Sequence, residues 1–354
     1  MSKPRFSSTI AVTGGAGFIG SNLLTYLVDH HHDRQFVNLD TLTYAGNLAN
    51  LKSIEDRPNY RFVKLDIADS GAVEAAFDRF QFDGIIHLAA ETHVDRSILG
   101  PHPFIRTNVA GTLTLLEAVR QSGRRIRFHH VSTDEVFGSL GPTGLFREDS
   151  PYRPSSPYAA SKASADHLVR AYHQTFGLDC VITNCSNNFG PYQFPEKLVP
   201  LTIRNAVAGE TIPVYGDGLQ VRDWLYVADH CRALDLVFRE GVTGSTYLIG
   251  ADNEVTNREI IQRVCRELDR RLGGGPREKL MRTVADRPGH DRRYAMDSAK
   301  IRQELGWAPS VSFDDAIAAT VDWYLTHADW LDACVTGEYR KYYELNYSNR
   351  QQAL

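Results

Sequence analysis

The stretch T-G-G-A-G-F-I-G-S-N, residues 13–22, decides the fold of this chain. It follows the short apolar run Thr9–Val12, which is typical of a β-strand, and it opens a helical pattern that continues to His30. Gly14, Gly17 and Gly20 allow a tight turn and a close approach of the backbone to a diphosphate, whose negative charge then faces the helix N-terminus. Because glycines also serve in ordinary strand-to-helix turns, the interpretation depends on the rest of the chain.

Apolar runs of strand length alternate with longer helical patterns through the first half of the chain. The predicted strands are Thr9–Val12, Phe36–Leu39, Tyr60–Leu65, Gly84–Leu88, Arg127–Val131 and Asp179–Thr183, and the predicted helices are Gly17–His30, Gly71–Phe80, Phe104–Gln121 and Pro157–Phe176. Such alternation indicates βαβ units with right-handed crossovers. The fold class that we predict is α/β, with a Rossmann-like doubly wound parallel sheet.

The pattern changes after about Asn184, where connections rich in proline, glycine and tyrosine separate the helical patterns 196–208, 228–239 and 257–272. We therefore expect a smaller α/β lobe, which binds the substrate, packed on the first domain. The dinucleotide-binding domain is assigned to residues 1–185 with a return segment at about 227–252, and the lobe to residues 186–226 and 253–354.

The composition excludes several classes of function. The 354 residues are 42% hydrophobic and carry a formal net charge of −4, so a surface for broad binding of nucleic acid or anionic membranes is not expected. The polar start lacks the apolar core of a signal peptide, and no apolar run reaches about 18 residues. Five cysteines without C-x-x-C spacing fit free thiols in a reducing cytoplasm.

A histidine run at residues 30–32 is the one sequence feature that invites a metal site. It falls at a helix exit and lacks an obvious fourth ligand, so we expect a solvated surface and no metal.

Asp40 ends the second predicted strand, twenty residues after Gly20. A carboxylate at this position accepts hydrogen bonds from both ribose hydroxyls and repels a 2′-phosphate, which favours NAD over NADP. The alternative role for Asp40 is a turn cap.

Tyr158 and Lys162 are four residues apart on a predicted helix and therefore share one face. A phenol with an ordinary pKa of about 10 needs a neighbouring cation to act as a base near neutrality. We expect the lysine ammonium, together with a nicotinamide cation, to supply this help.

The run Ser132, Thr133, Asp134, Glu135 follows the fifth predicted strand directly, at the sheet edge where doubly wound folds bind ligands. Two adjacent carboxyl groups in a cleft raise each other's pKa, and one protonated group beside one ionised group can divide an elimination between acid and base. The alternative is a solvated acidic turn.

Together with these residues, longer motifs extend over almost the whole chain. They are GGAGFIGSN, LDTLTYAGNLANL, LAAETHVDRS, STDEVFG, YAASKASADHLVRAY, NCSNNFGPYQFPEKLVP, VRDWLYVADH and DRPGHDRRYAMD. In this set the chain resembles the extended short-chain dehydrogenases, and within them the bacterial dTDP-glucose 4,6-dehydratases. Relatives often carry Tyr where this chain has Phe137 and Phe189.

The resemblance implies a hydro-lyase that converts dTDP-glucose to dTDP-4-keto-6-deoxy-glucose and water by oxidation, elimination and reduction with one tightly bound NAD, in deoxysugar biosynthesis. It implies that Tyr158 removes the C4 hydroxyl proton while Thr133 binds that hydroxyl. Glu135 would take the C5 proton and Asp134 would protonate the leaving C6 hydroxyl. It also implies a homodimer formed through helices 104–121 and 157–176.

The resemblance assigns further residues by motif position. For the cofactor they are Gly14, Gly17, Phe18, Ile19, Gly20, Asp40, Thr41, Leu42, Thr43, Asp66, Ile67, Ala89, Ala90, Glu91, Thr92, Thr107, Tyr158, Lys162 and Asn188. For the nucleotide sugar they are His93, Thr133, Asn187, Lys197, Leu198, Pro213, Val214, Tyr215, Arg222, Asn257, Arg287 and His290. Turn capping by Asp66, a structural role for His93, and ion pairing by Arg222 and Arg287 are the alternatives.

Epimerases and decarboxylases of the same superfamily would share the glycine motif, Asp40, Tyr158 and Lys162. The pair Asp134 and Glu135 favours a dehydratase over both. A non-catalytic NAD-binding protein is a further alternative, but it would be expected to have lost the tyrosine and lysine pair.

Overall fold

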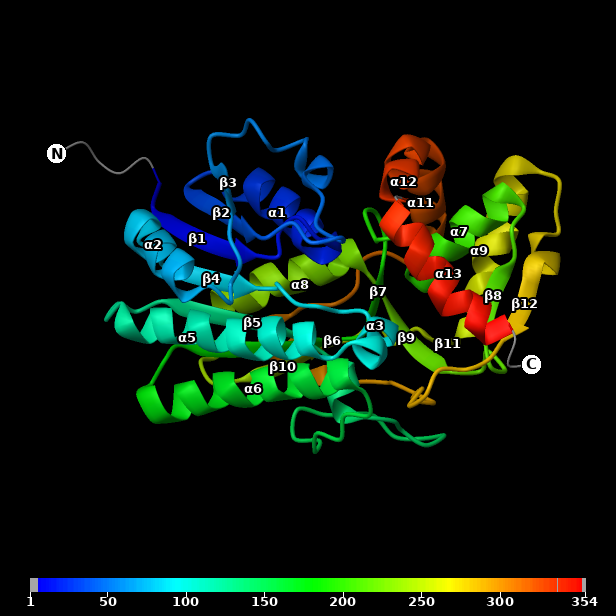
Figure 1. Cartoon of the computed structure of the whole chain (residues 1–354). Helices are drawn as coiled ribbons and strands as arrows, with labels where there is room; N and C mark the ends of the chain where they lie inside the picture. Colours follow the sequence, from blue (N-terminus) through cyan, green and yellow to red (C-terminus); the bar gives the residue numbers. More distant parts are fainter. Residues whose placement is uncertain (1–5, 336, 352–354) are drawn as a thin grey trace.

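The computed structural model describes residues 6–335 and 337–351. Its centre is a parallel sheet in the strand order β10-β6-β5-β4-β1-β2-β3 (Figure 1). The strands are β1 (Ser8–Thr13), β2 (Arg34–Asp40), β3 (Tyr60–Lys64), β4 (Gly84–His87), β5 (Arg127–Thr133), β6 (Cys180–Cys185) and β10 (Thr246–Ile249). The order runs outward from β1 in both directions, so the predicted doubly wound, Rossmann-like sheet is confirmed.

Helices cover both faces of this sheet, and each face has its own apolar core. On one face lie α1 (Phe18–His30), α8 (Val227–Glu240) and α10 (Ala299–Leu305), where Leu23 and Leu234 are buried together. On the other lie α2 (Ser70–Phe80), α5 (Thr112–Gln121) and α6 (Pro157–Phe176), where Leu115 and Val169 are buried. Strands with both faces covered explain why the predicted strands read as continuous apolar runs.

The predicted helix Phe104–Gln121 has an irregular first half. It begins with α4 (His102–Phe104), continues through a π-helical segment at Ile105–Gly111, and becomes α-helical in α5. A π-helical turn inside a helix often marks a functional site, because it redirects side chains at that point. Here it contains Thr107 at the cavity described below and the buried Asn108.

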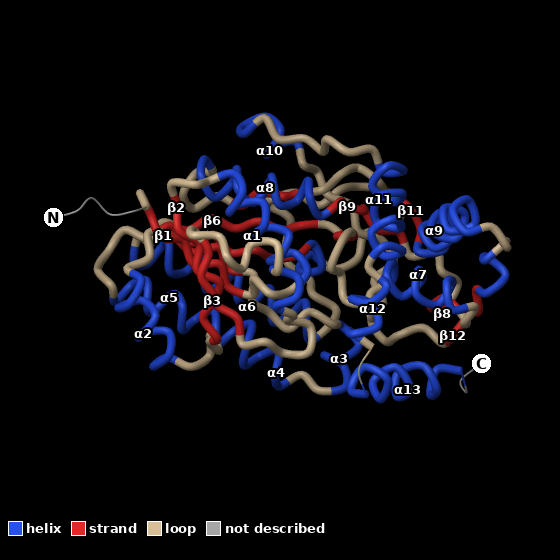
Figure 2. Tube along the Cα trace, turned by 90° about the horizontal axis from the view of Figure 1, so that it is seen from above, coloured by secondary structure: helices blue, strands red, loops and turns tan. Residues whose placement is uncertain are grey.

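A smaller group of elements lies at one end of the sheet, as both views show (Figures 1 and 2). A three-stranded sheet has the order β11-β9-β7 and a two-stranded sheet pairs β12 with β8. These strands are β7 (Asn187–Phe189), β8 (Ile212–Tyr215), β9 (Val221–Tyr226), β11 (Glu254–Thr256) and β12 (Met281–Val284). The helices are α7 (Leu198–Ala208), α9 (Asn257–Leu272), α11 (Phe313–Thr326), α12 (Ala328–Cys334) and α13 (Gly337–Gln351).

The predicted domain boundaries stay a prediction. Residues 1–5, 336 and 352–354, which fall within the predicted ranges, lie outside the described residues. Two short elements that the sequence did not indicate lie near the junction of the two parts: α3 (Val94–Leu99) and a 3₁₀ turn at Asp134–Phe137. Further 3₁₀ turns are at Leu48–Leu51 and Arg277–Leu280.

Two further sequence expectations concern the cysteines and the histidine run. All five cysteines are buried and free, as predicted. Of the histidine run, His30 and His32 are exposed, as expected, whereas His31 is partly buried and its Nε2 lies 2.9 Å from a carboxylate oxygen of the buried Asp235. Within the described ranges there is no cluster of three or more metal-ligating side chains and no helix long and apolar enough to cross a bilayer.

Candidate active site

A cavity of about 1000 Å³ opens along the carboxyl ends of the central strands. It is lined by the glycine turn, the ends of β2, β4 and β5, and the first turns of α6. Of the cofactor residues assigned from the sequence it contains Gly14, Gly17, Phe18, Ile19, Gly20, Asp40, Thr41, Thr43, Asp66, Ile67, Ala89, Ala90, Glu91, Thr92, Thr107, Tyr158, Lys162 and Asn188. Leu42 is not part of the lining, because its side chain packs against the apolar core.

A second cavity of about 170 Å³ lies on the side of the smaller lobe. It is lined by the assigned substrate residues His93, Asn187, Lys197, Leu198, Pro213, Val214, Tyr215, Arg222, Asn257, Arg287 and His290, whereas Thr133 lines the larger cavity. Both cavities include Glu135, Asn187, Glu196 and Lys197. Glu135 therefore lies at the junction of the two, and Asp134 lines the larger cavity beside it.

The glycine turn has the shape that a dinucleotide diphosphate requires. Gly14 has φ +70°, and a Cβ built on it would come within 2.7 Å of the backbone of Ala89. Helix α1 begins after Gly17 without a side-chain cap, so its first N–H groups have no capping partner and face the larger cavity. These features fit NAD, because unpaired N–H groups at a helix N-terminus bind phosphate.

Asp40 is buried and already holds two backbone groups. Its carboxylate accepts from the N–H of Ala16 at 2.9 Å and from that of Leu42 at 2.8 Å. Burial raises the pKa of Asp40, and these two hydrogen bonds oppose that rise. Asp40 thus acts as a turn cap, the alternative noted above, and at the same time borders the cavity.

Asp66 also has structural partners in addition to a place in the cavity wall. One oxygen accepts from the N–H of Ala68 at 2.9 Å, and the other lies 2.7 Å from the guanidinium of Arg106. The turn-capping alternative is therefore realised in the structure.

Asp134 is the more deeply buried member of the carboxylate pair, with 2% of its surface exposed. Its Oδ1 accepts from the Thr133 hydroxyl at 3.2 Å, while Oδ2 has no partner among the described residues. Burial, reinforced by the charge of Glu135, raises the pKa of Asp134 well above its ordinary range. This burial excludes the alternative of a solvated acidic turn and favours the protonated form of Asp134.

Glu135 has a different electrostatic environment. Burial raises the pKa of its carboxyl, but Arg287, Arg222 and Lys197 counteract that rise. The arginines and the lysine come from the smaller lobe, so the fold provides cations to one carboxyl group of the pair more than to its neighbour. The pair can therefore hold one proton donor beside one proton acceptor.

Helix α6 carries Tyr158 and Lys162 on its buried face. Its start is fixed by Ser156, whose hydroxyl accepts from the N–H of Ala159 at 3.1 Å, and by Pro157 in the first turn. Burial, followed by the charge of Glu135, raises the pKa of Tyr158 well above 10. The hydrogen bond from Thr133 lowers this pKa but does not outweigh burial, and the expected help from Lys162 together with a nicotinamide cation stays a prediction.

Lys162 points toward the neighbouring strand. Its Nζ donates to the carbonyl of Val131 at 2.9 Å, and burial lowers its pKa to about 8. The ammonium form is thus retained at neutral pH inside the protein.

The smaller cavity is lined by cations suited to a diphosphate. Arg222 stacks over the ring of Tyr294 at 4.2 Å and donates to the carbonyls of Val221 and Asp291. Nε of Arg287 is buried and has no hydrogen-bond partner among the described residues. The imidazole of His290 lies 2.6 Å from Asp286. Among these cations, Arg287 therefore retains an N–H donor, at Nε, that has no partner among the described residues.

The structure adds residues that the sequence did not single out. Glu196 accepts from the hydroxyl of Tyr44 at 3.0 Å and from Arg96 at 3.2 Å, and it lies 3.9 Å from His93, which is buried. Glu196 and Tyr294 fall inside motifs quoted above, but an adjacent lysine or arginine gave the stronger signal for anion binding.

Comparison with known proteins supports the assignment of this site. Residues 11–320 match the family described as GDP-mannose 4,6 dehydratase. A dTDP-glucose 4,6-dehydratase from Xanthomonas campestris pv. campestris (strain B100) is 54% identical over 344 residues, which cover 94% of this chain and 97% of that protein.

Two solved structures are similar over nearly their full length. The dTDP-glucose 4,6-dehydratase from Bacillus anthracis str. Ames, in complex with NAD, is 45% identical with a TM-score of 0.85, covering 93% of this chain and 100% of that one. The dTDP-glucose 4,6-dehydratase from Streptomyces venezuelae, with NAD and TYD bound, is 48% identical with a TM-score of 0.86, covering 92% and 99%.

Proposed function

This chain belongs to the GDP-mannose 4,6 dehydratase family, and from that premise we propose that it is an NAD-dependent dTDP-glucose 4,6-dehydratase. The observation that carries the proposal is the adjacent pair of Asp134 and Glu135. Asp134 is buried in the wall of the larger cavity, and Glu135 lines both cavities. A hydro-lyase needs an acid and a base on neighbouring carbons of its substrate, and an epimerase does not.

Bound NAD supplies the oxidising power at the sugar C4 and returns the reducing equivalent at C6. The residues of this chain then handle protons. Tyr158 accepts the proton of the C4 hydroxyl, which Thr133 holds in place. The new C4 ketone acidifies the C5 proton, which Glu135 removes, while Asp134 donates a proton to the C6 hydroxyl, which departs as water. When C6 is reduced, Glu135 returns its proton to C5.

The two cavities divide the binding work. The glycine turn and Asp40 would hold the NAD diphosphate and adenosine ribose, and Lys162 would hold the second ribose near Tyr158. Arg222 and Arg287 would hold the diphosphate of the nucleotide sugar, because guanidinium groups bind phosphate oxygens in pairs.

We also expect a homodimer that acts in the cytoplasm. The helices α5 and α6 expose apolar side chains, with Leu113 38% and Phe176 50% exposed. Burial of such a face between two copies would remove it from water.

The proposal is tested by product analysis with a panel of nucleotide sugars. The purified protein, incubated with dTDP-glucose, UDP-glucose, GDP-mannose and UDP-glucuronic acid separately, should convert dTDP-glucose fastest to a product lighter by one water. An isomer of unchanged mass would indicate an epimerase, and release of carbon dioxide from a UDP-sugar acid would indicate a decarboxylase. Bound NAD without any turnover would indicate a non-catalytic protein.

Asp40→Ala should weaken NAD binding by ~1–3 kcal/mol, because a charge-assisted hydrogen bond to the ribose is lost. The parent should bind NAD much more tightly than NADP, and isothermal titration calorimetry measures both affinities. Because Asp40 also caps its turn, Asp69→Ala is the matched control: Asp69 caps α2 through Ala72, away from the cavity. Equal affinity of the parent for both dinucleotides would contradict the role of Asp40.

A further inference from the structure

A buried carboxylate lies beneath the catalytic face of α6. Tyr158, Lys162 and Asp166 follow one another at intervals of four residues, so they share one side of the helix. The exposed fraction of Asp166 is 0%. A carboxylate this deep is costly unless charges or donors compensate it, so its surroundings indicate what it does.

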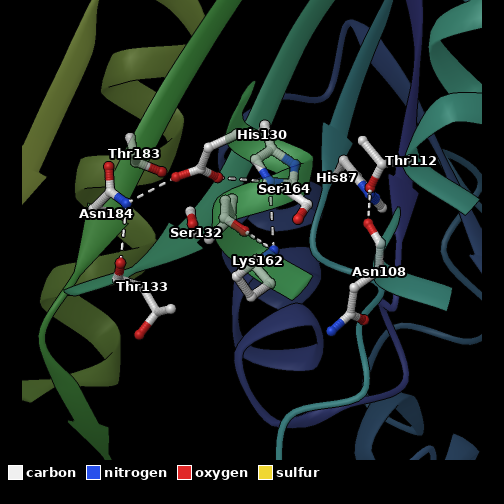
Figure 3. Close-up of polar contacts among 12 residues, drawn as sticks. His87, Asn108, Thr112, His130, Ser132, Thr133, Lys162, Ser164, Thr183 and Asn184 are labelled. Atoms are coloured by element: carbon white, nitrogen blue, oxygen red, sulfur yellow. Dashed lines mark hydrogen bonds and ion pairs between the residues drawn. The ribbon is translucent and has the colours of Figure 1, made fainter. Parts of the chain in front are cut away.

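The contacts of Asp166 connect it to the lysine. The hydroxyl of Tyr152 donates to Oδ2 at 2.7 Å, and Nδ2 of Asn184 donates to the same oxygen at 3.3 Å. Nε2 of His130 lies 3.2 Å from Oδ1 of Asp166 and 3.5 Å from Nζ of Lys162. Figure 3 shows Lys162 approaching His130, and Asn184 reaching from the other side to the carbonyl of Thr133 at 3.0 Å.

The charges of this cluster can be assigned. Burial lowers the pKa of His130 to about 4, so its imidazole is neutral. Burial alone would raise the pKa of Asp166, but His130, Lys162 and Tyr152 outweigh it and hold the pKa below its ordinary value. The cluster therefore contains one buried anion and one buried cation, with a neutral imidazole between them.

We propose that Asp166 is a positioning residue that acts through His130 as the buried counter-charge of Lys162 and keeps the lysine protonated. The role of this lysine in the reaction rests on the proposed dehydratase function. The electrostatic coupling of Asp166 to Lys162 does not, and it can be measured without turnover.

Other titratable groups face Lys162 from its own helix and from three strands of the central sheet. They are Tyr158 on α6, His87 on β4, His130 on β5 and Cys185 on β6. Burial raises the pKa of Cys185 to about 12 and lowers that of His87 well below its ordinary value, so both are neutral. None of these groups carries a negative charge at neutral pH, which leaves Asp166 as the anion of this cluster.

Asp166→Asn should lower the titration midpoint of Lys162 by about one pH unit, because an opposite charge favours the charged form of its neighbour. The midpoint is read by NMR on ¹³C-lysine-labelled protein without cofactor, and the Lys162 resonance is identified by its loss in Lys162→Arg. In single-turnover oxidation with NAD and dTDP-glucose, the alkaline limb of the pH profile should move to lower pH by a similar amount.

Asp235→Asn is the matched control, because the buried Asp235 also pairs with a histidine, the partly buried His31, outside both cavities. Asp235→Asn should leave the Lys162 midpoint unchanged. Asp166→Glu keeps the negative charge and should therefore have a Lys162 midpoint close to that of the parent. If Asp166→Asn does not fold, Asp166→Ser removes the same charge with a smaller side chain. A folded neutral variant with the parental Lys162 midpoint would overturn the proposal, whereas a shifted midpoint in a protein without dehydratase activity would overturn only the proposed function.

Discussion

The Tyr158→Phe variant is expected to bind the nucleotide sugar and to lose oxidation at C4 by a factor of about 10²–10⁴. Phenylalanine keeps the ring in its buried place but has no oxygen to accept the C4 hydroxyl proton. Because proton removal and oxidation occur together, the loss appears in the first chemical step. A single-turnover measurement of NADH absorbance after mixing with dTDP-glucose records that step.

The control for removal of a tyrosine hydroxyl is Tyr60→Phe. Tyr60 lies on β3, outside both cavities, and is also buried. Its hydroxyl accepts a hydrogen bond from Asn38 at 3.2 Å. This variant should oxidise C4 at the parental rate. A parental rate in Tyr158→Phe would exclude Tyr158 as the base and leave its buried hydroxyl without a function.

The structure explains why Tyr158 needs more than its own neighbours. Burial and the Glu135 charge hold the pKa of Tyr158 far above neutrality, and Lys162 is turned toward the carbonyl of Val131. A cation close to the phenol would lower that pKa. We therefore expect proton transfer from substrate to Tyr158 only in the complex with oxidised cofactor.

The central sheet could be predicted from the sequence because its signals are local. Most strands are buried on both faces and contain apolar runs, although the edge strand β3 exposes Arg61 and Lys64. The glycine motif between β1 and α1 determines where the winding starts. The π-helical segment is different. It depends on Asn108, which bonds to both backbone groups of Glu91 and to the hydroxyl of Ser161, and these partners are distant in sequence.

The smaller lobe was predicted only in outline, because its strands are short and their partners are far apart along the chain. Ile212 pairs with Met281, and Val255 pairs with Arg222. Strands of three or four residues carry too little periodicity to indicate such pairings.

For the candidate site, adjacency in the chain was enough to select Asp134 and Glu135, but not to assign their protonation. That difference depends on Arg222, Arg287 and Lys197, which the fold brings from the other lobe. Leu42 shows a different limit of the sequence. Its position inside a binding motif does not determine whether its side chain faces the cavity, and in the structure that side chain packs against the core.

The second large effect that we expect separates oxidation from elimination. In Glu135→Gln, oxidation at C4 should proceed because Tyr158 is unchanged, but the neutral amide cannot take the C5 proton. Reduced cofactor and a 4-keto sugar that retains its C6 oxygen should accumulate on the protein.

Asp134→Asn should impair the step at the neighbouring carbon, C6. The C5 proton can still leave, since Glu135 keeps its cationic surroundings, but the C6 hydroxyl has lost its proton donor. Water loss should slow by a factor of about 10²–10⁴, the usual contribution of a general acid. Because burial raises the pKa of the parent Asp134 and favours its protonated form, we expect the change to an amide of similar size to alter proton donation more than charge.

Deuterated buffer distinguishes the two variants in one experiment. Both are incubated with dTDP-glucose while NMR follows the C5 and C6 positions of the sugar. Asp134→Asn should exchange C5 hydrogen for deuterium faster than it loses water, because the base acts and the acid does not, whereas Glu135→Gln should show neither exchange nor water loss. If Glu135→Gln exchanges C5 and expels water as fast as the parent, another group is the base, and the buried pair no longer distinguishes this site from that of an epimerase.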